Sequence, residues 1–347
     1  MAPQQDGSSD RWTRGWSGGQ FSLLRIAAAF ALVVDFLTGL THSFPQSDSG
    51  GSLPIGTLAV QGSVIVCVAA LVGALAIGWF DRVAALLLAG LFVFDRFAIL
   101  AGGSSAGPPA SLLPGSSLRP VPSLLPAIAL ILIAATSAAP FGSFAARGRI
   151  DPSGGWTMPV LVPLFARILF AVSFLRWLSE PEGLWLLALL PLCLEPGWIP
   201  ASSVASRTRP VRIFYDGGCG LCHLAVRFVL AEARHLDDFV FSPIGSSSFS
   251  AAVSSNDRRN DDSPASMPDS IVVQSGGSLV FRSDAILLIL GRLGGLWRVI
   301  GIVCSVIPRL LRDRVYDWVA RNRKRLFTPP QAACPVLPAH LRERFEE

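Results

Sequence analysis

The sequence predicts a protein in two parts: an all-α membrane bundle of about six spanning helices, followed by an α/β domain with extra C-terminal helices. The chain of 347 residues is 51% hydrophobic and only 15% charged, whereas a soluble domain usually carries about 25% charged residues. Residues 1–206 hold ten basic and ten acidic residues, so the later residues supply the whole net charge of +5. A single soluble globule and a disordered or collagen-like chain are both excluded, and six cysteines are too few for a disulfide scaffold.

Long apolar runs define the predicted bundle. A bilayer core needs about 20 apolar residues, and the runs of about this length are residues 21–40, 58–80, 82–100, 121–140, 159–178 and 183–199. The segments between them are rich in Gly, Pro and Ser, as loops are. We therefore expect a polar N-terminal tail at 1–20, a transmembrane bundle at 21–200 and a linker at 201–210. In outline the bundle resembles the compact DoxX-like or HTTM type.

The basic residues of the loops predict the orientation. With six spans and a cytoplasmic N-terminus, the inside segments carry most of the loop arginines, among them Arg82, Arg147 and Arg149, while 41–57 and 179–182 carry none. This asymmetry follows the positive-inside rule. It predicts a multi-pass protein of the bacterial inner membrane, with the tail and the C-terminal domain in the cytoplasm.

The second part reads as an α/β domain over 211–347. The β-branched and aromatic run 211–216 predicts a strand that turns directly into a helix. Further strands are expected at 239–244 and 271–275, with a hairpin at Gly276–Gly277 and a loop at 250–268. Ser283–Asp284 should cap a helix, with others following near 296–307 and 311–325. This order of elements is that of a thioredoxin-like module with extra C-terminal helices.

The strongest chemical signal is Cys219-Gly-Leu-Cys222, placed where the strand becomes the helix. The N-terminus of a helix favours negative charge and lowers a thiol pKa. Cys219 is therefore the expected nucleophile, and Cys222, one helical turn later, the group that resolves a mixed disulfide. Asp216 could relay a proton to Cys222, and it could equally well only cap the turn.

A zinc site is the main competing interpretation of the cysteine pair. Cys219, Cys222 and His235 have the spacing of the first three ligands of a zinc finger, but residues 236–242 contain no fourth. Cys304 and Cys334 could complete such a site only through the fold. Because a strand precedes the motif and a helix follows it, a redox pair is favoured, and no metal or organic cofactor is expected.

Residues 211–346 resemble the DCC family of thiol–disulfide oxidoreductases, named for an Asp, Cys, Cys signature. The resemblance rests on FYDGGCGLCHLAVRFVL at 214–230, SDAILLILGRLGGLWR at 283–298 and RDRVYDWVARNRKRLF at 312–327, followed by Cys334. It implies a thioredoxin-like fold and protein-disulfide reductase activity, with Asp216, Cys219 and Cys222 as the signature residues. Pro268 is a candidate for the cis-proline that thioredoxins place opposite their cysteines.

The last of these blocks also predicts an amphipathic helix, in which Val315, Trp318 and Val319 share a face. The simpler expectation is that this face packs on the domain, and the alternative adds attraction to anionic lipid. Nucleic-acid binding is not expected, because no recognisable module is present. The expected partners are a protein or small-molecule disulfide, an unknown electron donor and the lipid bilayer.

The predicted function is therefore a membrane-anchored thiol–disulfide oxidoreductase. One alternative is a membrane electron-transfer protein whose bundle binds a quinone or another carrier, although Cys67 and Cys193 are the only cysteines available there. A second alternative is a non-catalytic interaction module with structural or zinc-bound cysteines.

Overall fold

The computed structural model describes residues 16–43, 55–102, 125–136, 142–146, 152, 158–159, 161–177, 199, 201, 210–233, 235–257, 271–327 and 339–346. The chain divides into two compact units. The first consists mainly of residues 18–147 and 155–194, and the second of residues 195–347 with the short segments 14–17 and 148–154. Each unit is described below by itself.

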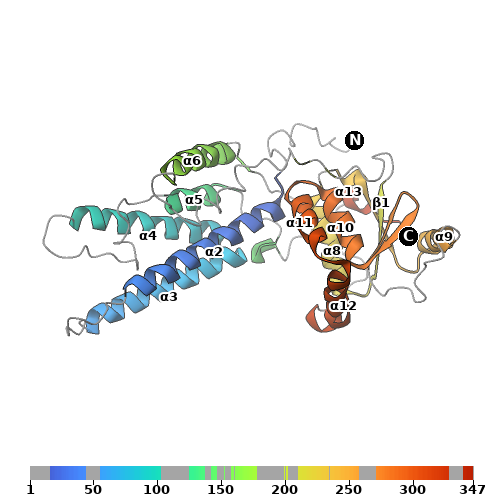
Figure 1. Ribbon diagram of the computed structural model, residues 1–347, viewed down its shortest axis with the longest axis horizontal. Coiled ribbons are helices and arrows are strands. Elements are labelled where there is room, and N and C mark those ends of the chain that lie inside the picture. Colours follow the sequence, from blue (N-terminus) through green and yellow to red (C-terminus); the bar gives the residue numbers. More distant parts are fainter. Residues whose placement is uncertain are drawn as a thin grey trace. The chain divides into compact units, whose positions relative to one another are not determined.

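The first unit is built from helices, and consecutive helices pack against each other along the chain (Figure 1). Its α-helices are α2 (Gly18–Ser43), α3 (Ile55–Ile77), α4 (Asp81–Gly102), α5 (Leu125–Ala134) and α6 (Leu161–Trp177), with a short 3-10 turn, η2, at Phe144–Ala146.

Charged side chains tie the ends of these helices together. Arg25 of α2 is fully buried, and its Nη1 lies 3.1 Å from Oδ2 of Asp81, the first residue of α4. Gly78 provides the room for this arginine, because a Cβ there would lie 2.4 Å from Arg25 Nη1. The neighbouring Arg82 donates from Nε to the carbonyl of Ala134 at the end of α5, at 3.0 Å. Asp81 is thus a structural group of this unit, and so is Arg82, which was expected in an inside segment of the membrane bundle.

The predicted membrane bundle is wrong. Of the helices built from described residues, none combines the length and the apolar character that crossing a membrane requires. Within the expected span 121–140 the structure describes a helix of ten residues, α5, and within 159–178 it describes α6, with 17 residues, against the roughly 20 that a bilayer core needs. Apart from residue 199, the run 183–199 lies outside the described residues. The predicted multi-pass inner-membrane localisation depended on these spans and is overturned by the same finding.

The second unit contains a four-stranded mixed sheet in the order β2-β1-β3-β4. β1 (Val211–Tyr215) pairs in parallel with β2 (Phe239–Pro243) and antiparallel with β3 (Val272–Ser275), which forms a hairpin with β4 (Ser278–Phe281). The parallel pair is connected by α8 (Gly220–Glu232) and a 3-10 turn, η4, at Leu236–Asp238. The predicted strands at 211–216, 239–244 and 271–275 and the predicted hairpin are therefore present.

The two faces of the sheet carry separate apolar cores, because alternate residues of a strand point to opposite sides. On one side Ile213 and Phe241 belong to a core that also includes residues of α8 and of α10 (Arg282–Leu293). On the other side Phe214 packs with Phe249 of α9 (Ser247–Asp257). A helical layer on each face thus holds β1, and with it the turn that follows β1, in a buried position.

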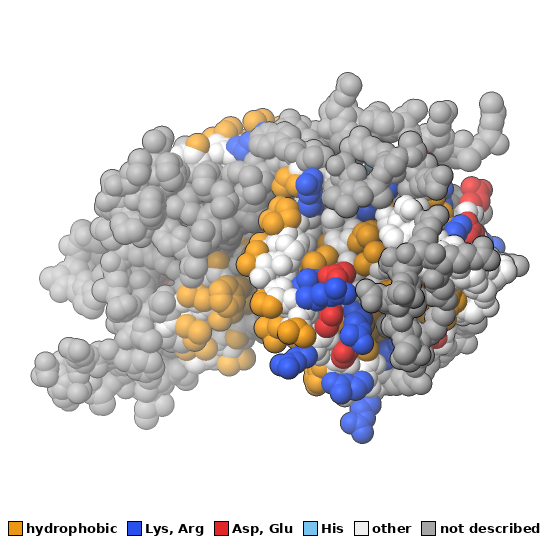
Figure 2. All heavy atoms as spheres, turned by 45° about the vertical axis from the view of Figure 1, so that its right-hand side comes forward, with side chains coloured by type: hydrophobic (Ala, Val, Ile, Leu, Met, Phe, Trp, Pro, Cys, Tyr) orange, Lys and Arg blue, Asp and Glu red, His pale blue; other side chains and the backbone are white. Residues whose placement is uncertain are grey.

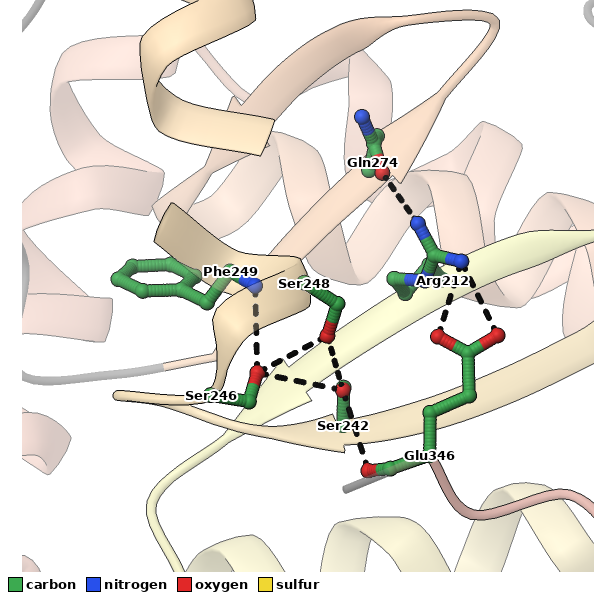
Figure 3. A network of polar contacts seen from close by, with 7 residues as sticks. All are labelled: Arg212, Ser242, Ser246, Ser248, Phe249, Gln274 and Glu346. Atoms are coloured by element: carbon green, nitrogen blue, oxygen red, sulfur yellow. Dashed lines mark hydrogen bonds and ion pairs between the residues drawn. The ribbon is translucent and has the colours of Figure 1, made fainter. Parts of the chain in front are cut away.

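α9 corrects the prediction of a loop beginning at residue 250. Ser246 caps this helix, since its hydroxyl accepts the backbone N–H of Phe249 at 3.2 Å, and Ser242 and Ser248 complete a hydroxyl cluster (Figure 3). Phe249 and Ala252 bury one side of the helix. The segment is rich in serine, so its sequence did not indicate this short apolar face.

The chain returns to the sheet at its C-terminal end, after α13 (Ala339–Arg342). Phe345 forms a parallel bridge with Phe241, and Glu346 donates its backbone N–H to the carbonyl of Phe241 at 2.9 Å. The Glu346 carboxylate also lies 2.9 Å from Arg212 of β1 (Figure 3). This last segment therefore covers the outer edge of β2.

The C-terminal helices α11 (Gly295–Val306) and α12 (Arg309–Leu326) lie where they were predicted. α12 packs on α10 and α8, but Val315 and Trp318 are 58% and 57% exposed. Apolar and basic side chains lie next to each other on the surface of the molecule (Figure 2). The predicted apolar face is thus not the face by which α12 packs, and the prediction of that contact is wrong.

Polar contacts hold α12 in place instead. Ser283 was expected to cap α10, but its hydroxyl donates to Asp313 of α12 at 2.5 Å. Asp284, the other expected capping residue, pairs with Arg312 at 3.1 Å. These contacts dock α12 on the first turn of α10.

Candidate functional site

The cysteine pair lies in the turn between β1 and α8. Cys219 has extended backbone angles (φ −107°, ψ 118°) and precedes the first residue of α8, and its carbonyl accepts the backbone N–H of His223 at 3.1 Å. Its side chain makes no capping hydrogen bond. Cys222 is in the first turn of the helix, where unpaired backbone N–H groups favour a negative charge. The predicted position of the pair at a helix N-terminus is therefore confirmed.

Both cysteines are free and buried, with exposed fractions of 5% for Cys219 and 3% for Cys222. They belong to the apolar core that β1, α8 and α10 share. In the same turn Gly217 borders open space, since a Cβ there would meet no atom within 4 Å, whereas a Cβ at Gly218 would lie 3.5 Å from Oδ1 of Asp216. A partner disulfide can therefore approach the turn from its glycine side.

Asp216 closes the turn. Its Oδ1 accepts the backbone N–H of Gly218 at 2.9 Å, and its backbone carbonyl accepts the N–H of Cys219 at 3.2 Å. These two hydrogen bonds fold the backbone tightly ahead of the helix, so the capping role considered for Asp216 is observed. Its second carboxylate oxygen, Oδ2, has a different partner.

That oxygen is held by Arg323 of α12. Nη2 of Arg323 lies 3.2 Å from Oδ2 of Asp216, across 107 residues of sequence. The arginine side chain is only 6% exposed, whereas that of Asp216 is 35% exposed. A buried cation therefore stands beside the cysteine turn. Reasoning from the sequence missed it, because Arg323 is one of several basic residues at the end of α12.

His223 follows the second cysteine and supports the turn from inside. Its Nε2 lies 2.9 Å from the carbonyl of Gly217. Because a carbonyl oxygen can only accept, this nitrogen carries the proton. The ring is 8% exposed and lies edge-on to Tyr215 of β1, with 6.1 Å between the ring centroids. His223 thus fixes the path of the backbone ahead of Cys219.

Burial raises the pKa of Cys222 to about 12. Desolvation of the thiolate is the largest cause, and the neighbouring Cys219 raises the pKa further. A backbone hydrogen bond at Asp216 and the positive charge of Arg323 act in the opposite direction. The lowered pKa that the sequence predicts for Cys219 stays a prediction.

The remaining predicted residues do not gather at this site. His235 is exposed in the segment between α8 and β2, and Cys304 is a free cysteine of α11. Across the part of the chain that the structure describes, no three His, Cys, Asp or Glu side chains are grouped so as to hold a metal ion. Cys67 is exposed on α3 in the first unit. Pro268, Cys193 and Cys334 lie outside the described residues.

Comparison with known proteins relates this site to a family. Residues 213–329 match the profile of the DCC1-like thiol-disulfide oxidoreductase family. The matched region includes most of β1, the cysteine turn and Arg323 of α12. This similarity suggests thiol–disulfide oxidoreductase activity.

Part of the chain also matches a curated relative. It is similar to the uncharacterized protein YuxK of Bacillus subtilis (strain 168), with 26% identity over 136 residues. The alignment takes in 38% of this chain and 91% of the relative. No solved structure matches the chain significantly.

Proposed function

We propose that the chain is a protein-disulfide reductase in which Cys219 and Cys222 exchange with a disulfide of a polypeptide substrate. The single observation that supports this best is the arrangement of two free cysteines one helical turn apart at the N-terminus of α8. Such an arrangement allows one sulfur to attack and its neighbour to resolve. The family match supports the same chemistry.

The proposed reaction balances as a two-electron exchange. The Cys219 thiolate attacks one sulfur of the substrate disulfide, and the other substrate sulfur leaves as a thiolate and takes up a proton. Cys222 then loses its proton and attacks Cys219. This step forms the Cys219–Cys222 disulfide and releases the second substrate thiol. A dithiol reductant returns the pair to its reduced state.

Asp216 has a proposed second role in this scheme. Its carboxylate is partly exposed and lies in the turn next to both cysteines. A proton leaving Cys222 needs an acceptor, because the sulfur is buried in an apolar core. We assign Asp216 as the group that relays this proton to solvent through water.

Reduction of a protein disulfide tests the proposal. The full chain should accelerate the reduction of insulin by dithiothreitol, measured by the turbidity of the released B chain. The Cys304→Ser chain is the matched control, since Cys304 is also a free cysteine but belongs to α11, and it should be as active as the parent. A rate equal to that of dithiothreitol alone, with folded protein, would rule out reduction of protein disulfides.

A further inference from the structure

The ion pair between Asp216 and Arg323 joins the cysteine turn to the far end of the C-terminal helix. Arg323 lies in the last turn of α12, and its side chain is buried while the neighbouring Arg321 and Arg325 are exposed. An arginine side chain that is only 6% exposed loses most of its hydration. This loss costs free energy, which its partners must offset. The described contacts give it one carboxylate, that of Asp216.

The charge of Arg323 matters because Cys222, the resolving cysteine, must become a thiolate before it can attack. Cys222 is 3% exposed and sits in an apolar core, where a thiolate is strongly disfavoured. The charged or titratable groups around it are Cys219 and His223 of its own turn and helix, Asp216 after β1, and Arg323 of α12. Of these, the side chain that is permanently positive is Arg323.

We propose that Arg323 is a positioning residue for the resolving step: it holds the Asp216 carboxylate at the turn and supplies the positive charge that stabilises the Cys222 thiolate. This inference rests on the proposed function. In the mixed disulfide, the Cys222 thiolate attacks the sulfur of Cys219, the bond to the substrate sulfur breaks, and the substrate thiolate takes up the proton. Arg323 touches none of these sulfurs, and it acts through its charge and through Asp216.

Alkylation of Cys222 in a Cys219→Ser background isolates this effect from turnover. Replacing Arg323 by glutamine there should slow the reaction of Cys222 with iodoacetamide at pH 9 by about tenfold, because an opposite charge nearby shifts a pKa by about one unit or more. Arg321→Gln is the matched control on the same helix, since Arg321 is exposed and bonds only the carbonyl of Asp317 among the contacts described. Its rate should stay within about twofold of the parent.

An Asp216→Asn background distinguishes the effect of the Arg323 charge from the effect of Arg323 on the position of the Asp216 carboxylate. If Arg323 acted only by orienting that carboxylate, its replacement would have no effect once Asp216 is Asn. We expect Arg323→Gln to slow alkylation in the Asp216→Asn background as well. An unchanged rate there, with a native circular-dichroism spectrum, would overturn the proposal.

The proposal can be tested even if the Arg323→Gln chain does not fold. Arg323→Lys keeps a positive charge at this position and should retain the alkylation rate within about threefold. A tenfold loss in the lysine variant would contradict a role for the charge. Because the assay follows a single thiol without a disulfide substrate, its outcome is independent of whether the insulin assay succeeds.

Discussion

A Cys222→Ser chain should accumulate as a covalent adduct with its disulfide substrate. Cys219 can still attack in this chain, but the sulfur that would release the adduct is missing. The Cys219→Ser chain should form no adduct, and its turnover should fall by roughly 10³-fold or more, as when an enzyme loses its attacking nucleophile. Non-reducing gels and mass spectrometry after incubation with an oxidised peptide measure the adduct directly.

The same pair of variants can contradict the assignment of roles. Each is buried in the same core and differs from the parent by one atom, so a difference in stability does not explain opposite behaviour. If Cys219→Ser formed the stable adduct and Cys222→Ser did not, the attacking and resolving sulfurs would be reversed. A Cys304→Ser chain should turn over normally and form no stable adduct.

The second large effect concerns the pH at which Cys222 reacts. Burial raises the pKa of Cys222 to about 12, and a Cys219→Ser chain loses only the smaller contribution of Cys219 to this rise. In that chain Cys222 should therefore alkylate at neutral pH at least about 100-fold more slowly than a free thiol, whose pKa is about 8.5. The direction follows from burial: the protonated form is favoured in the apolar core, so reactivity appears only as the pH rises. The rate should still be increasing between pH 9 and pH 10.

Time courses with iodoacetamide from pH 6 to pH 10, read by peptide mass spectrometry, measure this profile. Cys304, which is partly exposed on α11, gives an internal reference in every sample. A Cys222 rate that levels off below pH 9 in folded protein would show that burial does not control its ionisation. The role of Arg323 as the counter-charge to that burial would then lose its basis.

The α/β part could be predicted because its signals are local. The run from Val211 to Tyr215 is β-branched and aromatic, and the two cysteines follow it at helical spacing, so the strand, the turn and the helix follow from adjacent residues. The hairpin at Gly276–Gly277 is equally local: both glycines have positive φ angles, of 60° and 90°, which glycine adopts without strain. Such features need no knowledge of distant contacts.

Two features of the same domain could not be predicted because they depend on distant contacts. α9 becomes a helix through burial of Phe249 against Phe214, which is 35 positions earlier in the sequence. Arg323 is distinguished from other basic residues of α12 only by the contact with Asp216, across 107 residues. Amphipathic spacing indicated the wrong side of α12, because polar pairs rather than the face of Val315 and Trp318 dock this helix.

The first unit was predicted wrongly for a different reason. Long apolar runs were equated with spanning helices, although no helix of the described residues combines the length and the apolar character that crossing a membrane requires. Residues 125–134 form only ten residues of helix, about 15 Å at 1.5 Å per residue. Arg25 and Asp81 show a second limit, because their buried ion pair joins residues 56 positions apart, which the sequence pattern did not indicate.

The reversible linking of Cys219 to Cys222 tests the central claim most directly. The full chain can be equilibrated in thiol–disulfide buffers of stepped potential, alkylated, digested and analysed by mass spectrometry, with zinc content measured on the same sample. We expect both cysteines to lose their alkylation together in one two-electron step, with a peptide joined through their sulfurs, and Cys219→Ser to abolish that step. Two sulfurs that stay separate at every potential, or that hold stoichiometric zinc with no such step, would contradict the claim.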